Sequence, residues 1–505
     1  MLSRVATFAI DGVEPRAVSV EVDIRAGLPA FTIVGLGDAA VRESRERIRA
    51  AIQNAGFKFP QSRITANLAP ASLRKVGPGF DAALALAVLA ASEQIPSASL
   101  GEVAVFGELS LGGELRDAPG VLAVAEGASR CRIPRLIVPR ERAREAALVD
   151  GIEVAGVVGL AEAVDAIVGL RTPPLPGAPP PPRLPDEPDL ADVRGHPVPL
   201  LALQIAAAGG HNLMLEGPPG TGKTMLARRV PSILPPLTRD EALEVTRIHS
   251  IAGVHAGGLV RSRPFRAPHH TISPAGLVGG GSVPRPGEAS LAHMGVLFLD
   301  ELSEFQRLTL EALRQPLEDG RVTIVRGQRA LVFPTRVMLV AATNPCPCGY
   351  AGAGDRCACS ELDLRRHQRR LSGPLLDRMD LLVAVERPDE QELRGPPTID
   401  SATARARVGE ARERQLARLR GTIATCNGDL DVGMVRSCVR LEERALAALG
   451  AAYTAGTLSA RGRLRVIRVA QTVADLAGRD RISQADVLLA LSLRQRGGGD
   501  ELRAA

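Results

Sequence analysis

The segment His211–Thr224, which reads HNLMLEGPPGTGKT, decides the fold because a short apolar run leads directly into a glycine-rich loop. The pattern GxxxxGK[ST] between a strand and a helix is typical of loops whose backbone N–H groups surround phosphate. We therefore expect a strand over His211–Glu216 and a helix over Met225–Val230. A chance glycine-rich turn is the alternative, and the strand–loop–helix context argues against it. The residues expected to bind the nucleotide are Gly217, Pro218, Pro219, Gly220, Thr221, Gly222, Lys223 and Thr224.

The lysine of this loop is informative because the chain contains few others. Lysine occurs only at Lys58, Lys75 and Lys223 among 62 basic residues. A lysine at this position of a phosphate loop reaches the β- and γ-phosphates as a compact charge, and the neighbouring Thr224 hydroxyl is placed to bind Mg²⁺. The loop predicts a site for ATP and Mg²⁺.

Two further strands each end in polar side chains. Val296–Asp300 reads VLFLD and is followed by Glu301, so we expect Asp300 to hold the Mg²⁺ shell and Glu301 to polarise the attacking water. A strand over Val337–Ala342 leads to Asn344, whose amide is placed to orient that water. Aspartate and glutamate after an apolar strand are common, but their order and spacing after Lys223 favour a nucleotide site.

One arginine is a candidate for a site shared between subunits. Arg378 lies in the segment GPLLDRMD, and we expect it to reach the γ-phosphate of a neighbouring subunit. For Arg378 considered alone, a surface salt bridge is the alternative. A finger supplied to a neighbour implies a ring, because one subunit cannot complete its own site.

Length and composition predict a globular protein of several domains. At 505 residues, 45% hydrophobic and 23% charged, the chain is expected to form about three domains. The longest apolar run, Ala82–Ala91, is about half the ~20 residues of a membrane span, and the N-terminus resembles no secretory signal. We therefore expect a cytoplasmic protein with no membrane partner. The domains expected are residues 1–170, a proline-rich linker at 171–190, an ATPase core at 191–390, a helical region at 391–496 and a tail at 497–505.

The charge balance is mildly basic, at +6 with a pI of about 9.2. Without Trp and with two Tyr and ten Phe, the chain is poorly suited to base stacking, so any nucleic acid would be bound through its phosphates. The arginine-rich segment Ser401–Arg420 predicts a helix. We expect its arginines to face solvent or another subunit rather than a DNA groove.

The runs GPPGTGKT, FLDE, ATNPCPCG and LSGPLLDRMD resemble the AAA+ superfamily, and more narrowly the magnesium-chelatase-like AAA+ proteins of the YifB or ComM family. The similarity extends from VDIRAGLPAFTIVGLGDAAVRESRERIRAAIQNAGF to SARGRLRVIRVAQTVADL, nearly the whole chain. It implies an α/β fold class with a Lon-protease-like (ribosomal S5 domain 2-like) N-terminal domain, an AAA+ P-loop domain and a helical C-terminal lid. It also implies a homohexamer that acts on single-stranded or branched DNA. ComM-type members are described as branch-migration helicases in natural transformation.

The resemblance also suggests parts that contact DNA. The Gly/Pro-rich loop segment Arg261–Gly295 resembles the helix-2 insert that points into the ring pore. Arg321–Phe333 has period-two strands around a glycine turn and resembles the pre-sensor-1 hairpin, which places Arg326 and Arg329 near the tip as DNA contacts. A hairpin that only packs between subunits is the alternative. The family pattern places the second sensor at Arg461, with Arg465 or Arg468 as alternatives.

The N-terminal region is not expected to be a protease, although it resembles the Lon-type fold. In Lon-type proteases the nucleophilic serine follows a Gly-Pro pair. Here Gly77-Pro78 is followed by Gly79, and no lysine follows Lys75 in this region. Nucleophile and base are both missing, so a scaffold or a DNA-guiding role remains.

Seven cysteines without a secretory signal argue against a disulfide framework. Four of them cluster in a loop where thiolates could hold a structural Zn²⁺, and unligated thiols are an equal alternative because the spacing is C-x-C rather than C-x₂-C. The four residues are Cys346, Cys348, Cys357 and Cys359. His269 and His270 are expected to shape the insert rather than to bind metal.

Three functions stay open at this point. The first is a DNA-stimulated ATPase and translocase, the second a chelatase-type motor that drives metal insertion into a tetrapyrrole, and the third an ATP-gated scaffold. The ATPase core does not separate the first two, because fold does not decide function. The N-terminal region and the cysteine loop favour the DNA motor, and the complete set of predicted site residues argues against the scaffold.

Overall fold

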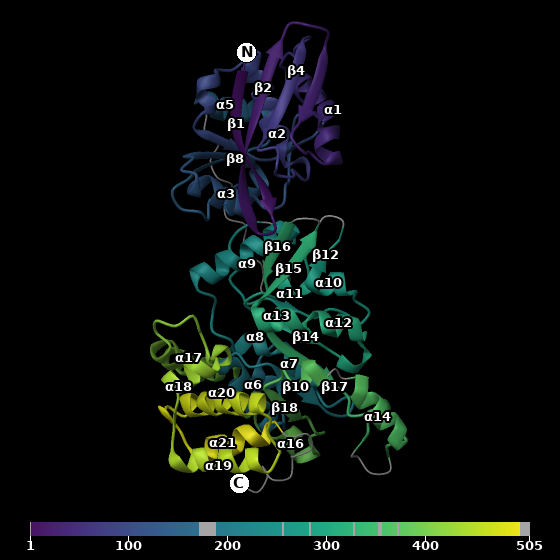
Figure 1. Ribbon diagram of the computed structural model, residues 1–505, viewed down its shortest axis with the longest axis vertical. Helices are drawn as coiled ribbons and strands as arrows, with labels where there is room; N and C mark the ends of the chain where they lie inside the picture. The colour runs from purple at the N-terminus through teal and green to yellow at the C-terminus, as the bar shows by residue number, and fades with distance from the viewer. Residues whose placement is uncertain are drawn as a thin grey trace.

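The computed structural model describes residues 2–170, 188–254, 257–281, 284–326, 329–351, 356–370 and 373–494. Two α/β modules are stacked along the long axis, and the C-terminal helices pack against the second module (Figure 1). The predicted linker lies outside the described residues up to residue 187, and the predicted tail lies outside them entirely. Among the described helices, none has the length and apolar character needed to cross a membrane.

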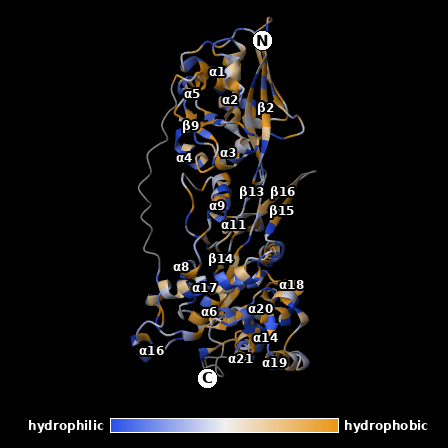
Figure 2. Cartoon of the chain, turned by 90° about the vertical axis from the view of Figure 1, so that its left-hand side faces the viewer, coloured by the Kyte–Doolittle hydropathy of each residue, from blue (hydrophilic) through white to orange (hydrophobic). Residues whose placement is uncertain are grey.

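The N-terminal module is built on a seven-stranded mixed sheet with the order β3-β4-β2-β1-β5-β8-β9. Every residue of the apolar helix α2 (Asp81–Ala91) is buried. By contrast, the polar helix α16 (Glu390–Arg394) in the C-terminal part of the chain has no buried residue and lies at the periphery (Figure 2). The strands are β1 (Leu2–Asp11), β2 (Glu14–Arg25), β3 (Ala30–Val34), β4 (Arg63–Ala69), β5 (Val103–Val105), β8 (Arg135–Pro139) and β9 (Glu153–Val157). The helices are α1 (Ala39–Asn54), α2 (Asp81–Ala91), α3 (Val121–Arg130), α4 (Ala143–Ala146) and α5 (Leu160–Val168).

The second module has a five-stranded parallel sheet with the order β11-β14-β17-β10-β18. Apart from its edge strand β11, its strands are mainly buried and apolar because helices cover both sides, as in other parallel sheets. The strands are β10 (Leu213–Glu216), β11 (Phe265–Arg266), β14 (Val296–Leu299), β17 (Met338–Thr343) and β18 (Leu381–Ala384). The helices before and around the sheet include α6 (Pro197–Gly209), α7 (Lys223–Arg228), α8 (Val230–Ile233) and α9 (Arg239–Ala252).

Two predicted segments differ from the structure. Arg261–Gly295 is not only loop: it contains the edge strand β11, the helices α10 (Pro274–Val278) and α11 (Glu288–Leu291), and the strand pair β12 (Gly279–Gly280) and β13 (Arg285–Pro286). The helix predicted over Ser303–Leu317 is broken into α12 (Arg307–Ala312) and α13 (Arg314–Asp319). Pro316 explains the break, because proline has no N–H to donate to the carbonyl of Ala312.

Strands β15 (Arg321–Arg326) and β16 (Arg329–Pro334) pair antiparallel, which confirms the hairpin predicted from the sequence. The base of this hairpin packs on the N-terminal module. Val13, in the turn between β1 and β2, shares a buried apolar cluster with Ile248, Leu291 and Phe333. Beside it, α9 bonds to α3, where Gly120 N–H donates to Ser250 O at 3.2 Å. The hairpin, α9 and the N-terminal module therefore form one joint.

The C-terminal part of the chain is helical. The helices are α14 (Glu361–Arg370), α15 (Gly373–Leu376), α16 (Glu390–Arg394), α17 (Ser401–Arg418), α18 (Val432–Cys438), α19 (Glu443–Thr454), α20 (Ala460–Leu476) and α21 (Gln484–Ser492). Four of the six arginines in Ser401–Arg420 are exposed, as expected, whereas Arg412 and Arg418 are half-buried. Arg405 donates to Ser232 O at 2.7 Å, Arg412 donates to Ala207 O at 3.0 Å, and Arg418 pairs with Asp475 at 2.7 Å. Arg405 and Arg412 therefore tie the C-terminal helices to the second module, and Arg418 joins α17 to α20.

Replacing Asp475 should destabilise the packing of the C-terminal helices. Its carboxylate is buried and accepts two bonds from Arg418 at 2.7 Å and one from Asn427 at 2.8 Å. Asp475→Ala leaves that guanidinium buried without its partner, so we expect a loss of about 3–5 kcal/mol. The measurement is urea unfolding followed by circular dichroism. Arg407→Ala, on the exposed side of α17, is the control, and equal midpoints for the two variants would contradict the prediction.

Candidate nucleotide-binding site

The carboxyl ends of three neighbouring strands gather the predicted nucleotide-binding residues at one edge of the sheet. The phosphate loop follows β10, Asp300 follows β14 and Asn344 follows β17. The Thr224 hydroxyl donates to Asp300 Oδ2 at 2.8 Å, and Lys223 Nζ donates to Asn344 Oδ1 at 3.2 Å. Parallel strands bring their carboxyl ends together, so this grouping follows from the sheet order.

The loop itself depends on its glycines. A Cβ on Gly217 would lie 2.1 Å from the carbonyl oxygen of Val385, so no larger residue fits there. Gly220 and Gly222 have φ of +78° and +87°, a backbone conformation that glycine adopts without strain. Thr221 Oγ1 closes the turn by donating to Pro218 O at 2.9 Å.

Lys223 lies inside this loop. Its ammonium donates to the carbonyl oxygens of Gly217 and Pro218, both at 2.7 Å. Burial lowers the pKa of Lys223, while the charge of Asp300 acts in the opposite direction. The backbone of the phosphate loop therefore surrounds the Lys223 ammonium and holds it through two carbonyl oxygens.

Glu301 lies beside Asp300 in an unusual backbone conformation. Its φ is +50°, and its N–H donates to Asp300 Oδ1 at 3.0 Å. The Glu301 side chain is 58% exposed, and its Oε2 atom lies 3.6 Å from Nδ1 of His270. His270 also packs against His269, with ring centroids 4.1 Å apart.

His270 is the residue that sequence reasoning missed. The sequence predicts only that His270 shapes the insert. In the structure His270, which precedes α10, lies beside the carboxylate of Glu301, which follows β14. The only signal in the sequence is the His269–His270 pair, which does not by itself indicate a contact 31 residues later in the chain. The contact depends on the folding of the insert.

Arg378 lies at the end of the sheet where the parallel strands begin, and the phosphate loop lies at the end where they finish. Its carbonyl accepts from Asn212 Nδ2 at 3.2 Å, and Asn212 immediately precedes β10, whereas the loop follows that strand. Four residues of strand separate the two edges by about 13 Å. The structure thus does not bring Arg378 to Lys223 of its own chain. The guanidinium instead pairs with Glu318.

Other arginines surround Arg378. Burial, followed by the charges of Arg314, Arg461 and Arg465, lowers the pKa of Arg378. Among the three sensor candidates, Arg461 at the start of α20 is exposed. Arg465 pairs with Asp380 at 3.6 Å, and Arg468 donates to Leu430 O at 2.6 Å. Arg461 is thus the exposed candidate near Arg378. Arg465 and Arg468 are each engaged with a partner inside the chain.

The predicted DNA contacts lie on the hairpin. Arg326 and Arg329 are paired across β15 and β16, at the ends of the strands next to the turn. In Figure 1 the hairpin lies at the end of the second module that faces the N-terminal module, away from α19. The turn between these two arginines falls outside the described residues.

The N-terminal module has no room for a protease nucleophile at the predicted position. A Cβ on Gly79 would lie 2.5 Å from the ring of Phe106. The ammonium of Lys75 is buried, and it donates to Leu68 O at 2.6 Å and Pro70 O at 2.5 Å. The space at Gly79 is thus filled by Phe106, and the Lys75 ammonium is held by carbonyl oxygens of its own module.

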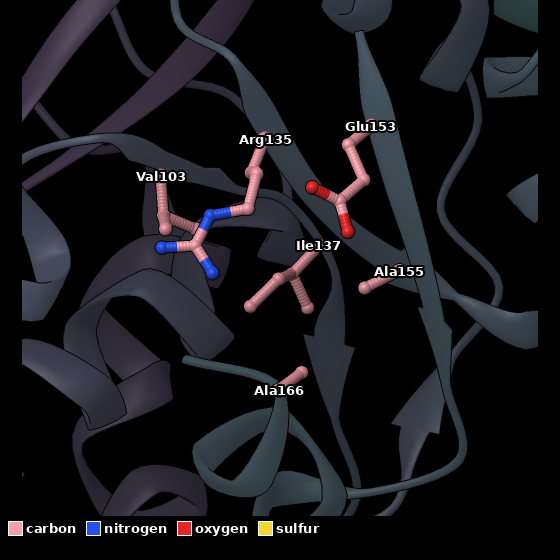
Figure 3. Close-up of a pocket in the computed structure, with 6 residues that line it drawn as sticks. All are labelled: Val103, Arg135, Ile137, Glu153, Ala155 and Ala166. Carbon is pink, nitrogen blue, oxygen red and sulfur yellow. The ribbon is translucent and has the colours of Figure 1, made fainter. Parts of the chain in front are cut away.

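A small cavity in the same module does not provide a ligand site. Figure 3 shows it beneath Arg135 and Glu153, which come from β8 and β9. Its volume is about 10 Å³. That is enough for one water molecule and too small for a substrate or cofactor.

Known protein families match most of this chain. A model described as magnesium chelatase, subunit ChlI, matches residues 189–393, one described as subunit ChlI of Mg-chelatase matches residues 20–142, and one for the ChlI C-terminal region matches residues 398–494. An uncharacterized protein of Mycobacterium tuberculosis is 44% identical over 98% of this chain and 99% of its own length.

Two further relatives carry family names. The uncharacterized protein YifB of Escherichia coli is 42% identical over 98% of this chain and 97% of its own length. The competence protein ComM of Haemophilus influenzae is 40% identical over 96% of this chain and 95% of its own length. Together with the phosphate loop and its neighbours at the sheet edge, these similarities establish that the chain belongs to the YifB/ComM family of magnesium-chelatase-like AAA+ ATPases.

Proposed function

We propose that this chain is a subunit of an ATP-hydrolysing ring motor that moves on single-stranded or branched DNA, with branch migration in recombination or natural transformation as its activity. Family membership implies the ATPase activity. The observation that carries the ring is the separation of Arg378 from the phosphate loop by the length of β10. The name of the ComM relative supports the connection to DNA uptake.

The residues present fit ATP with Mg²⁺. The Thr224 hydroxyl and the Asp300 carboxylate are hard oxygen ligands 2.8 Å apart, which is the donor chemistry that Mg²⁺ prefers. When bound, the metal neutralises charge on the β- and γ-phosphates. Lys223 would leave the loop carbonyls for these phosphates, and the loop backbone would cradle them.

The remaining residues provide the chemistry of hydrolysis. Glu301 would accept a hydrogen bond from the attacking water and polarise it, while the Asn344 amide would orient the same water. His270 would position the Glu301 carboxylate without touching the nucleotide. Since His270 belongs to the insert, movement of the insert would change the position of the base.

The ring supplies the missing cation. Arg378, with Arg461 nearby, would face the γ-phosphate of a neighbouring subunit. Mutual repulsion among these guanidiniums makes the region a good place for a polyanion, because a phosphate relieves the repulsion. A homohexamer with six shared sites is the assembly proposed.

DNA would be held at the hairpin through its phosphates. The chain lacks Trp and has only two Tyr, so base stacking contributes little. Arg326 and Arg329 are the proposed contacts. Because Val13 and Phe333 share one apolar cluster, the N-terminal module would move with the hairpin and guide the DNA toward it.

A chelatase-type motor that drives metal insertion into a tetrapyrrole is the second candidate. The descriptions of all three matching family models favour it. An ATP-gated scaffold is a third and requires a defective site. The following experiments separate these candidates.

The direct test is ATP hydrolysis by the purified full chain alone, with single-stranded DNA and with a four-way junction, each across a salt series. A motor that tracks phosphates should be stimulated by DNA, with the stimulation fading as salt rises. Stronger stimulation by the junction supports branch migration. Absence of stimulation by any DNA at low salt contradicts the DNA motor and favours the chelatase or scaffold function.

Glu301→Gln should bind ATP and hydrolyse it at least about a hundredfold more slowly, because the amide is too weak a base to polarise water. The measurement pairs nucleotide binding, by a fluorescent ATP analogue, with steady-state turnover. Glu311→Gln, on α12, is the matched control. Near-normal turnover in Glu301→Gln would disprove the assignment of the base.

His270→Ala should lower kcat roughly tenfold and leave the KM for ATP unchanged, because a positioning residue acts on the base and not on nucleotide binding. His270→Gln should recover part of the rate, since its amide N–H can be offered to the Glu301 carboxylate in place of the imidazole. His269→Ala is the control, because His269 Nδ1 contacts Thr271 Oγ1 at 2.9 Å. Equal kcat values for the two alanine variants would exclude this role.

The double variant Arg326→Ala/Arg329→Ala should keep its basal ATPase and lose DNA stimulation, because it removes two phosphate contacts without changing the nucleotide site. Arg436→Ala/Arg444→Ala removes the same charge from α18 and α19 and should remain stimulated. If stimulation survives in the hairpin variant, the hairpin is not the DNA contact.

A further inference from the structure

We propose that Cys346, Cys348, Cys357 and Cys359 bind one structural Zn²⁺. This ion would fix the segment that follows Asn344 where it packs against the phosphate loop. The four sulfur atoms all lie within 4.8 Å of one another. Three of their separations are 3.3 Å (Cys346–Cys348), 3.9 Å (Cys346–Cys357) and 3.7 Å (Cys348–Cys357).

These separations match a zinc site. Zn–S bonds of about 2.3 Å to the corners of a tetrahedron place the sulfur atoms about 3.8 Å apart. Sulfur atoms joined in a disulfide would be only about 2.05 Å apart. The four thiols are thus arranged at the distance of metal ligands and not at that of a covalent bond. Four soft sulfur ligands in a tetrahedron select zinc over Mg²⁺ or Ca²⁺.

The backbone around the cysteines supports a charged sulfur cluster. Gly349 has φ of +87° and donates its N–H to Cys346 O at 3.0 Å, which closes a tight turn over Cys346–Gly349. The Ala351 N–H then donates to Cys346 Sγ at 3.2 Å. Such N–H···S bonds stabilise thiolate ligands. Binding would form four Zn–S bonds and release the thiol protons to solvent.

The position of the loop gives the ion its role. Cys346 is buried two residues after Asn344, and the Asn344 carbonyl oxygen is hydrogen-bonded by His367 at 2.9 Å. Gly349 lies so close to Pro219 of the phosphate loop that a Cβ there would be 2.6 Å from Pro219 Cδ. A cluster held rigid by zinc would therefore support Pro219 and Asn344 from the same side. With four protein ligands, the ion has no open position for a substrate.

This role depends on the proposed nucleotide site, whereas the presence of the metal does not. Zinc content is measured on the purified full chain by elemental analysis, with about one Zn²⁺ per chain expected. Cys348→Ser/Cys359→Ser should lose it, and Cys131→Ser/Cys438→Ser, which changes two cysteines outside the cluster, should retain it. Iron in place of zinc, no metal, or equal zinc in both double variants overturns the site.

A second measurement avoids variants that fail to fold. Thiols of the wild-type chain are counted with a chromogenic disulfide reagent before and after a zinc chelator, and chelation should expose four additional thiols. Chelation should also weaken binding of a fluorescent ATP analogue at least about fivefold, because Pro219 and Asn344 lose their support. Unchanged nucleotide affinity after complete zinc removal overturns the structural role. Zinc-loaded protein that does not hydrolyse ATP would instead contradict the proposed function and leave the metal site intact.

Discussion

The two ends of strand β10 determine how this protein can work. The phosphate loop leaves its carboxyl end, and Asn212, which holds the Arg378 carbonyl, lies at its amino end. A strand is stiff and its length is fixed by its residues, so the cation at one end cannot reach a phosphate at the other. In the ring proposed above, the parts of one nucleotide site would therefore be divided between two subunits.

The same arrangement would couple the proposed DNA contact to hydrolysis. The hairpin β15–β16, α9 and the turn between β1 and β2 meet in one apolar cluster, while the insert brings His270 to Glu301. Packed cores respond as units, so displacement of the hairpin would be transmitted to the helices that border the insert. A zinc-stiffened cysteine loop would hold the other side of the site still, so that only the base and the neighbour's arginine would move.

Local sequence was enough to predict the strands and the phosphate loop. The apolar runs that end in GPPGTGKT and in Asp300-Glu301 have the continuous hydrophobic character of buried parallel strands. The order of these strands in the sheet then brings Lys223 to Asn344. Features set by tertiary contacts could not be predicted in this way. The two residues of β11 carry too little pattern to distinguish an edge strand from a loop, and the role of His270 depends on how the insert folds. The bonds that Arg412 and Arg418 make inside the chain could not be predicted either, because a long side chain can reach a carbonyl or a carboxylate on a neighbouring helix.

The most direct measurement mixes two inactive subunits. Arg378→Ala keeps its own phosphate loop, and Lys223→Ala keeps its own arginine, so a ring that contains both has interfaces with a complete site. Random mixing in equal amounts should restore about a quarter of the wild-type ATPase, because one interface in four then joins an intact loop to an intact arginine. A mixture of Lys223→Ala and Glu301→Gln should stay inactive, since both residues belong to the same edge of the sheet. An Arg378→Ala and Lys223→Ala mixture that forms rings but hydrolyses no more ATP than either variant alone would contradict the shared site.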